Sequence, residues 1–281
     1  MSEVEIKSQF IAYLDILGYD KHIGNGKALA FYNLIKSIVN DIRTIQKNSN
    51  NSGYLHPIPN CVNIKMFSDN LIICSERNWQ NVLNFSHMIQ QKFMQNDVFV
   101  RGSLYFGELL FDDEFVLGQG LIDAYKIESE IAIFPRIIVD QTFIVNAEEE
   151  IYQRTGHRNK ISPPKNESDI NYSQLRYDHC DENIFIDYLS SCIFESFHKT
   201  EYIEGEIIKR VVEQNENYFA DIIYKHKKIV KKNIEENIND IRKMKILQKY
   251  QWCKNYHNNY CSKYNQEYLY SKGCFDNIFI E

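Results

Sequence analysis

Residues 10–140 alternate between short apolar runs and longer amphipathic segments, and this order limits the fold more than any other property of the chain. Apolar and aromatic runs predict strands at residues 10–15, 62–67, 71–75, 99–105, 109–111 and 136–140. Apolar residues spaced three and four apart predict helices at residues 27–47, 79–95 and 119–130. The resulting β-α-β-β-α-β order is typical of a ferredoxin-like (split βαβ) α+β fold, an antiparallel sheet with helices on one face.

The rest of the chain has a different character. Residues 154–171 are polar and contain proline, which predicts an insertion, and residues 183–189 predict a last strand. From about Ile193 onward, apolar residues follow a helical stripe with Lys and Glu between them. We therefore expect an α+β domain over residues 1–190 and a helical C-terminal extension over residues 191–281.

Charge and cysteine usage exclude several classes of protein. The formal net charge of −6 argues against a general nucleic-acid binder, because phosphate contacts need a basic surface. The seven cysteines include no CxxC pair, so neither a zinc site nor a disulfide framework is expected. The start, MSEVEIKSQ, lacks the features of a signal peptide, and no apolar run approaches the ~18 residues of a membrane span. We expect a cytoplasmic protein that binds neither nucleic acid nor membrane.

Two aspartates lie where predicted strands end. Asp15 closes the first strand just before Gly18, and Asp69 lies at the tight turn of the next hairpin. In a split βαβ sheet the first strand and the hairpin are neighbours, so both carboxylates can reach one pair of ions. Magnesium prefers hard oxygen ligands and combines one or two carboxylates with substrate phosphates. The sequence therefore predicts a magnesium site for a nucleoside triphosphate, with the Gly18 turn offering backbone N–H groups to a phosphate.

Four segments carry a more specific pattern, in this order between residues 8 and 145: FIAYLDILGY, KMFSDN, VRGSLYFGE and LGQGLIDAYKIES. Together they resemble the catalytic domain of class III nucleotide cyclases. In that family an aspartate followed by Ile-x-Gly-Phe/Tyr ends the first strand, and a Gly/Ser-Asp at the hairpin supplies a second metal carboxylate. The later segments PRIIVD, NIFIDYL and KYQWCKNYHN resemble the bacterial cyclases of the Pycsar antiphage systems, which make cyclic pyrimidine nucleotides.

The resemblance implies a role for individual residues of the metal site. Asp15, Asp69 and the backbone carbonyl of Ile16 match the ligands of two Mg²⁺ or Mn²⁺ ions. Arg101 matches an arginine that approaches the phosphates, and Lys126 takes the place of a second, catalytic arginine. Both cations would balance the charge that builds on the phosphates.

The resemblance also implies the substrate-binding residues. Gly18 and Tyr19 belong to the turn after the first strand, and Lys65 lies four residues before the hairpin aspartate, where the family places a residue that faces the base. A lysine can donate to a base carbonyl but cannot accept from an exocyclic amine. Lys65 therefore favours uracil over cytosine.

The helical segment departs from the family pattern. With Gly118 aligned on the glycine of the motif, Ile122 replaces an asparagine that acts on the transition state and Lys126 replaces the arginine. Asp20 replaces a hydroxyl residue. Losing one transition-state donor typically costs about 2.7–4 kcal/mol, and lysine lacks the bidentate fork of arginine. We expect either a slower enzyme than a purine cyclase or a pocket built for another substrate.

The predicted function is a pyrimidine nucleotide cyclase that converts UTP, or CTP, to the 3′,5′-cyclic monophosphate and pyrophosphate. The resemblance further implies a homodimer, a separately encoded effector protein that senses the product, and a role in bacterial antiphage defence. Two alternatives stay open. One is an adenylate or guanylate cyclase, and the other is a non-catalytic module that uses a cyclase fold as a sensor.

Overall fold

The structure is a computed structural model, which describes residues 5–24, 26–51, 62–163, 174–178, 180–190, 207–263 and 278–281. The chain divides into two compact units. The first comprises Met1–Ile89 and Phe99–Asp187, and the second comprises Gln90–Val98 and Tyr188–Glu281. The second unit therefore includes a segment from the middle of the chain, which the sequence analysis placed inside the domain of residues 1–190.

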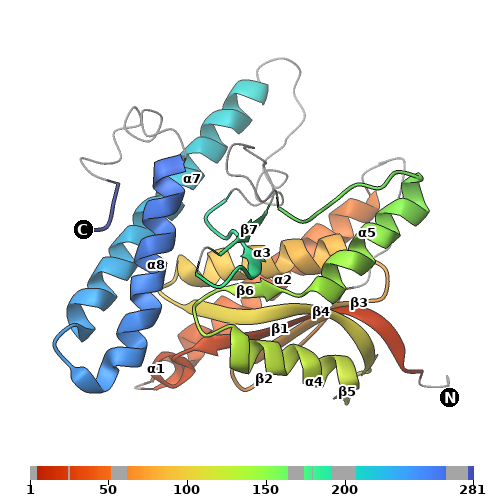
Figure 1. The fold of residues 1–281 in the computed structure, drawn as a ribbon, viewed down its shortest axis with the longest axis horizontal. Helices are drawn as coiled ribbons and strands as arrows, with labels where there is room; N and C mark the ends of the chain where they lie inside the picture. The colour runs from red at the N-terminus through yellow and green to blue at the C-terminus, as the bar shows by residue number, and fades with distance from the viewer. Residues whose placement is uncertain are drawn as a thin grey trace. The chain divides into compact units, whose positions relative to one another are not determined.

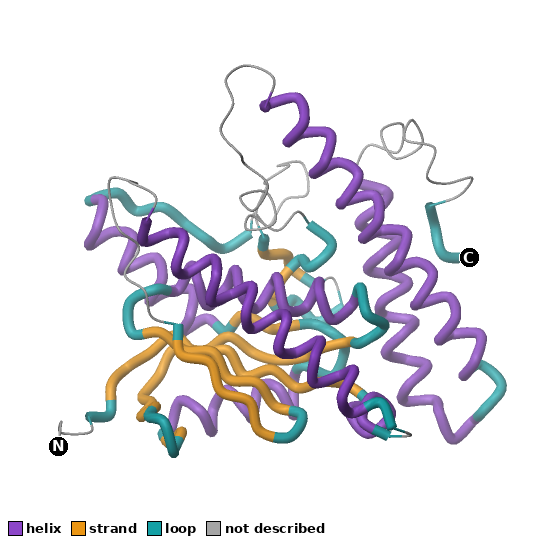
Figure 2. The backbone as a smooth tube through the Cα atoms, turned by 180° about the vertical axis from the view of Figure 1, so that it is seen from behind, coloured by secondary structure: helices purple, strands orange, loops and turns teal. Residues whose placement is uncertain are grey.

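The first unit is a mixed α+β structure built on an eight-stranded sheet. Its strands are β1 (Lys7–Leu17), β2 (Asn63–Phe67), β3 (Asn70–Ser75), β4 (Phe99–Phe111), β5 (Val116–Leu117), β6 (Ile137–Val139), β7 (Leu175–Tyr177) and β8 (Ile184–Ile186). The helices are α1 (Tyr19–Ile23), α2 (Ala28–Asn51), α3 (Trp79–Met94), α4 (Gln119–Lys126) and α5 (Gln141–Thr155). α3 continues into the second unit. Figure 2 shows the strands lying side by side between helices.

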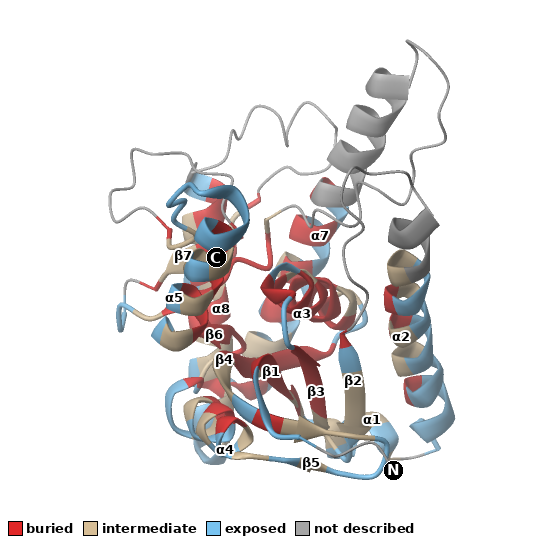
Figure 3. Ribbon diagram, turned by 90° about the vertical axis from the view of Figure 1, so that its right-hand side faces the viewer, coloured by how far each residue is buried: buried red, intermediate tan, exposed pale blue. Residues whose placement is uncertain are grey.

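The strands follow the order β2-β3-β1-β4-β6-β8-β7, and β5 pairs with the end of β4. β1 runs antiparallel to both β3 and β4, and β1 and β3 are largely buried (Figure 3). β6, however, runs parallel to β4. The sheet is therefore mixed, and the expectation of a wholly antiparallel sheet was wrong.

β4 is one continuous strand, although the sequence predicted a break at Gly107. Gly107 lies opposite Gln9, and the pairing with β1 continues from Phe99 to Leu109 without interruption. The long partner strand supplies backbone hydrogen bonds on both sides of the glycine, which offset its low strand propensity.

Helices cover both faces of the sheet, not the single face expected. The Phe10 ring contacts the Phe143 ring of α5, with the ring centroids 5.2 Å apart. Its neighbour Ile11 belongs to a buried cluster with Ala124 of α4. Successive strand residues point to opposite faces, so α5 and α4 cover opposite sides, as Figure 1 shows.

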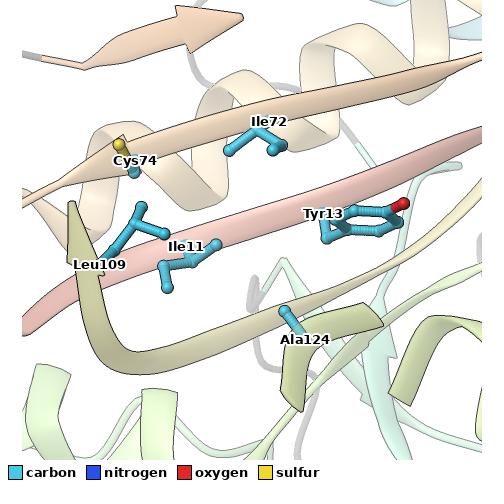
Figure 4. Packing of buried hydrophobic residues seen from close by; sticks show 6 residues of the cluster. All are labelled: Ile11, Tyr13, Ile72, Cys74, Leu109 and Ala124. Carbon is cyan, nitrogen blue, oxygen red and sulfur yellow. The ribbon is translucent and has the colours of Figure 1, made fainter. Parts of the chain in front are cut away.

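α4 packs closely on its face of the sheet. The buried cluster beneath it comprises Ile11, Tyr13, Ile72, Cys74, Leu109 and Ala124 (Figure 4). Ser103 of β4 donates a hydrogen bond from Oγ to the Ala124 carbonyl at 2.7 Å. At the start of the helix, Gly118 has φ 146°, and a Cβ there would lie 2.3 Å from the Glu108 carbonyl oxygen. Only glycine permits this approach, which fixes α4 against β4.

Two polar arrangements fasten the β6 side of the first unit. Arg136, which precedes β6, is fully buried, and its guanidinium pairs with Asp178 and Asp181 in the loop between β7 and β8. Asp140 is the N-cap of α5, and its Oδ1 accepts a hydrogen bond from the Thr142 N–H at 2.8 Å. Both arrangements satisfy groups that would otherwise be costly to bury.

The second unit contains α7 (Ile207–Asn237) and α8 (Met244–Lys263), joined through a 3₁₀ turn at Ile241–Lys243. The two helices pack side by side (Figure 1). The helical character expected from Ile193 onward is confirmed for these ranges, while residues 191–206 and 264–277 lie outside the described part of the chain. Within that part, no helix is long and apolar enough to cross a membrane.

A buried hydrogen-bonded chain crosses the second unit. The Tyr188 hydroxyl lies 3.0 Å from His226 Nε2, and the two Nδ1 atoms of His226 and His257 lie 3.1 Å apart. His257 Nε2 then lies 2.8 Å from the Ile278 carbonyl oxygen. A carbonyl only accepts, so His257 donates from Nε2, His226 donates to His257, and Tyr188 donates to His226. This order requires both imidazoles to be neutral.

Candidate functional site

Asp15 lies near the end of β1, opposite Asn70 of β3 and Arg101 of β4. Residues directly opposite one another in a sheet point to the same face. The Asp15 side chain therefore lies on the α4 face, as does that of Tyr13 two residues earlier. It is 14% exposed, and its Oδ2 accepts a hydrogen bond from Arg101 Nε at 2.8 Å. The strand register thus brings two predicted site residues into contact.

The β2–β3 hairpin places Asp69 beside the end of β1. Its turn consists of Ser68 and Asp69, and Ser68 takes a left-handed conformation with φ 55°. The Ile16 N–H donates to the Asp69 carbonyl at 2.9 Å, so the strand end and the turn are joined directly. Asn70 Nδ2 donates to Asp69 Oδ1 at 3.0 Å and orients the carboxylate. The two predicted metal-binding aspartates therefore lie at one end of adjoining strands.

The structure adds Glu128, which the sequence analysis did not single out. It lies in a π-helical turn, Ile127–Ile131, that follows α4 directly, and its side chain is 3% exposed. Glu128 Oε1 lies 2.6 Å from Arg101 Nε, so Arg101 contacts both Glu128 and Asp15. A signal was present in the sequence, because Gly120, Ala124 and Glu128 recur every four residues and all three are buried.

Tyr13 lies among these acidic groups. Burial first, and then the negative charges of Glu128 and Asp15 with smaller contributions from Tyr125 and Asp69, raise the pKa of its hydroxyl to about 12. The Tyr13 and Tyr125 rings meet edge to face with centroids 5.8 Å apart. The Tyr13 hydroxyl thus feels the negative charge of all three carboxylates and stays protonated near neutral pH.

The charge of this group favours a cation. Asp15, Asp69 and Glu128 contribute −3 as carboxylates and Arg101 contributes +1, which leaves a net charge of −2. Among the described residues there is no cluster of three or more His, Cys, Asp or Glu side chains arranged to hold a metal. Asp15 and Asp69 nevertheless form a pair, and Mg²⁺ commonly takes one or two carboxylates alongside phosphate oxygens. The residues present fit such an ion.

Gly18 and Tyr19 form the turn that leaves β1. Gly18 has φ 70°, and its carbonyl accepts a hydrogen bond from the Lys21 N–H at 2.9 Å. The helix that follows, α1, has only five residues. The Tyr19 ring packs edge to face on Phe31 of α2 with centroids 5.6 Å apart. Tyr19 therefore contributes to helix packing, while its predicted contact with substrate stays a prediction.

Lys65 lies on β2, on the same row of the sheet as Ile72 of β3 and Tyr13 of β1. That row is one same-face step from the row that holds Asp15. The Lys65 ammonium donates to the Asp112 carbonyl at 3.0 Å and lies 5.4 Å from the centroid of the Phe111 ring. These contacts hold the ammonium on the α4 face.

Lys126 and Ile122 lie on the outer side of α4. The Lys126 side chain is 55% exposed, and its Nζ lies 3.4 Å from Asp123 Oδ1. Asp123 also accepts a hydrogen bond from Gln119 Nε2 at 3.0 Å. Ile122 is 49% exposed. Lys126 thus pairs with a residue of its own helix, whereas Arg101 contacts Asp15.

Comparison with known proteins gives little further identification. No family model matches the chain, and no curated protein matches it. A solved structure that it resembles is the guanylyl cyclase Cya2, with a TM-score of 0.30 and 10% sequence identity, covering 51% of this chain and 79% of that chain. A likeness this remote carries no weight for the reaction.

Proposed function

We propose that this chain is a nucleotide cyclase that converts UTP, or CTP, to the 3′,5′-cyclic monophosphate. The ribose 3′-oxygen attacks the α-phosphorus, the bond to the β-phosphate oxygen breaks, pyrophosphate leaves, and the hydroxyl proton passes to solvent. The observation that carries the proposal is the position of Asp15 and Asp69 at one end of adjoining strands, joined by the hydrogen bond from the Ile16 N–H to the Asp69 carbonyl. The order of the four cyclase-like segments agrees with it.

Asp15, Asp69 and the Ile16 carbonyl would hold the divalent cations, Mg²⁺ or Mn²⁺. Bound there, the cations would lower the pKa of the 3′-hydroxyl and neutralise the triphosphate. Arg101 would carry positive charge toward the phosphates, because its guanidinium already lies at the Asp15 carboxylate. Tyr13 stays protonated, since burial and the neighbouring carboxylates raise its pKa to about 12. Its hydroxyl can therefore donate a hydrogen bond but does not serve as a base.

The preference for uracil rests on Lys65. Its ammonium can only donate, so it suits the O4 carbonyl of uracil and not the exocyclic amine of cytosine. The hydrogen bond to the Asp112 carbonyl holds this ammonium on the same face as Asp15. Replacement of Lys65 by Gln, which can both donate and accept, should narrow the preference between UTP and CTP.

The wider proposals follow the same resemblance. A cytoplasmic homodimer would bury the large apolar side chains that lie exposed around α4 and β5, which are Phe115, Leu117, Ile122 and Tyr125. Its cyclic nucleotide would be sensed by a separately encoded effector in antiphage defence. The exposed Ile122 and Lys126 favour the second candidate function, a non-catalytic cyclase-fold sensor.

The test is incubation of the purified chain with each of ATP, GTP, CTP and UTP and with Mg²⁺ or Mn²⁺, followed by mass spectrometry of the products. We expect cyclic UMP as the main product. Asp69→Asn should lower its rate at least about 100-fold, the scale on which single groups that act on a transition state are lost. Asp113→Asn, an exposed position in the β4–β5 turn, is the matched control.

Each outcome decides between the candidates. A cyclic purine product would keep the reaction but overturn the pyrimidine assignment. No cyclic product from any nucleotide, with the chain folded and the substrate bound, would favour the sensor. Full turnover by Asp69→Asn would remove the assigned metal site.

A further inference from the structure

Arg101 is shared between two carboxylates of different depth. Its Nε lies 2.8 Å from Asp15 Oδ2 and 2.6 Å from Glu128 Oε1. The exposed fractions of the three side chains are 23% for Arg101, 14% for Asp15 and 3% for Glu128. The ion pair with Glu128 is thus the more shielded from water, and the ion pair with Asp15 lies nearer the surface.

The backbone fixes Glu128 in this inner position. It is part of the π-helical turn Ile127–Ile131, and π turns inside helices commonly occur at functional sites because they redirect a side chain. The preceding helix is fastened to the sheet through the Ser103 hydrogen bond to Ala124, four residues before Glu128. Glu130 in the same turn points to solvent and is exposed. The turn therefore separates one buried carboxylate from a neighbouring exposed one.

The three charges cannot all keep their present partners when a cation binds. A carboxylate at the depth of Glu128 needs a positive partner, because the desolvation of an unpaired charge costs several kcal/mol. Asp15 is less buried, and its carboxylate, which already accepts from Arg101, is the group for which Arg101 and an incoming cation would compete. A divalent cation at Asp15 would repel the guanidinium as well as displace it. Arg101 would then depend on Glu128 to stay at the site.

We propose that Glu128 is a positioning residue for Arg101, and that Arg101 pairs with Asp15 only until a divalent cation takes that carboxylate, after which Glu128 alone retains it. The inference rests on the proposed role of Asp15 as a metal ligand. The Asp15–Arg101 ion pair is then a resting contact, which neutralises the aspartate while no cation is bound. Glu128 keeps the freed guanidinium beside the site, where its N–H groups can meet a phosphate.

The test is a double-mutant cycle on cation binding by the full chain without nucleotide. The probe is Mn²⁺ alone, titrated to millimolar concentration, with free Mn²⁺ measured by electron paramagnetic resonance. Arg101→Gln removes the competitor and should tighten Mn²⁺ binding. Glu128→Gln leaves Arg101 with Asp15 as its stronger partner and should weaken binding roughly tenfold, the scale of one charge-assisted contact. Glu130→Gln is the matched control and should bind as the parent chain does.

The double variant Arg101→Gln/Glu128→Gln separates positioning from simple electrostatics. If Glu128 acts through Arg101, Glu128→Gln should have little effect once Arg101 is gone. Equal weakening with and without Arg101 would overturn the proposal, as would a parent chain that binds no Mn²⁺. The double variant removes both members of the Arg101–Glu128 ion pair, so it should fold even where Arg101→Gln alone, which leaves Glu128 buried without this partner, does not. Because no nucleotide is present, the Mn²⁺ cycle and the cyclase assay are independent readouts. The chain can show the expected Mn²⁺ binding without cyclase activity, and it can show cyclase activity without the expected coupling between Glu128 and Arg101.

Discussion

Acid should destabilise the second unit through His226 and His257. Their Nδ1 atoms lie 3.1 Å apart, and only one proton can occupy that contact. Protonation of His257 at Nδ1 would set its new N–H against the N–H that His226 donates, and protonation of His226 at Nε2 would set its new N–H against the hydroxyl hydrogen that Tyr188 donates. Burial lowers the pKa of both rings, and for His226 the neighbouring His257 lowers it further.

The size of the effect follows from His257. Burial lowers its pKa from 6.5 to about 4, with Lys227 acting in the same direction and the Ile278 hydrogen bond opposing. The folded unit therefore resists a proton that the unfolded chain accepts. The stabilisation is complete above pH 6.5 and is lost as the pH falls toward about 4. The interval from 6.5 to about 4 corresponds to about 3 kcal/mol at 1.36 kcal/mol per pH unit.

The two tryptophans allow this loss to be measured in the second unit alone. Trp252 lies in α8, whereas Trp79 lies in the first unit. In a Trp79→Phe background, urea unfolding followed by Trp252 fluorescence should shift to lower urea as the pH falls from 6.5 toward about 4. His257→Gln keeps a donor for the Ile278 carbonyl but does not titrate. The free energy of unfolding that this variant loses over the same pH interval should therefore be smaller by about 3 kcal/mol. The same pH dependence in both chains would refute the reasoning.

Three further changes test the packing of the first unit by thermal unfolding. Gly118→Ala should destabilise it by at least about 2 kcal/mol, because the new Cβ would meet the Glu108 carbonyl oxygen at 2.3 Å and φ is 146°; an unchanged midpoint would contradict the close approach of α4. Arg136→Ala should cost about 3–5 kcal/mol, since it leaves Asp178 buried without its guanidinium, and a smaller loss would mean that water reaches the carboxylate. Asp140→Ala should cost about 1 kcal/mol through loss of the α5 N-cap. Asp140→Asn, which can still cap the helix, should retain most of that stabilisation.

The sequence predicts the elements of the first unit well where local chemistry decides them. Asp and Asn at positions 69 and 70 favour a turn, and the hairpin forms there. The predicted helix at 79–95 is observed at Trp79–Met94 because its apolar residues keep the helical spacing. Gly107 predicts a strand break that does not occur, since the pairing of β4 with β1 outweighs the local preference of a glycine. The face on which each helix packs was also missed, because a periodic pattern identifies a buried side without naming its partner.

In the candidate site, too, the sequence indicates individual residues but not the partners that they contact. The sequence indicates Asp15 and Asp69 because one ends a predicted strand and the other lies in a predicted hairpin turn, whereas their contacts with Arg101 and Ile16 depend on strand register. Glu128 was overlooked for a different reason. A carboxylate on the apolar side of a helix is recognisable by its spacing from Ala124, but only the three-dimensional structure shows that Arg101 lies beneath it. The helical period predicts that the residue is buried, and the sheet determines what it meets.

The same contrast between helix and sheet applies to Ile122 and Lys126, the two α4 residues that depart from the cyclase pattern. Ile122 is exposed and Lys126 pairs with Asp123, so neither adds charge to Asp15 in this structure. Arg101 does bring positive charge to Asp15, and the pairing of β4 with β1 along the whole of β1 holds its backbone opposite Asp15. A cation fixed on a strand loses less side-chain freedom on meeting a phosphate than one on an exposed helix surface. The replacements on α4 therefore leave unchanged the charge that Arg101 brings to Asp15 from the sheet.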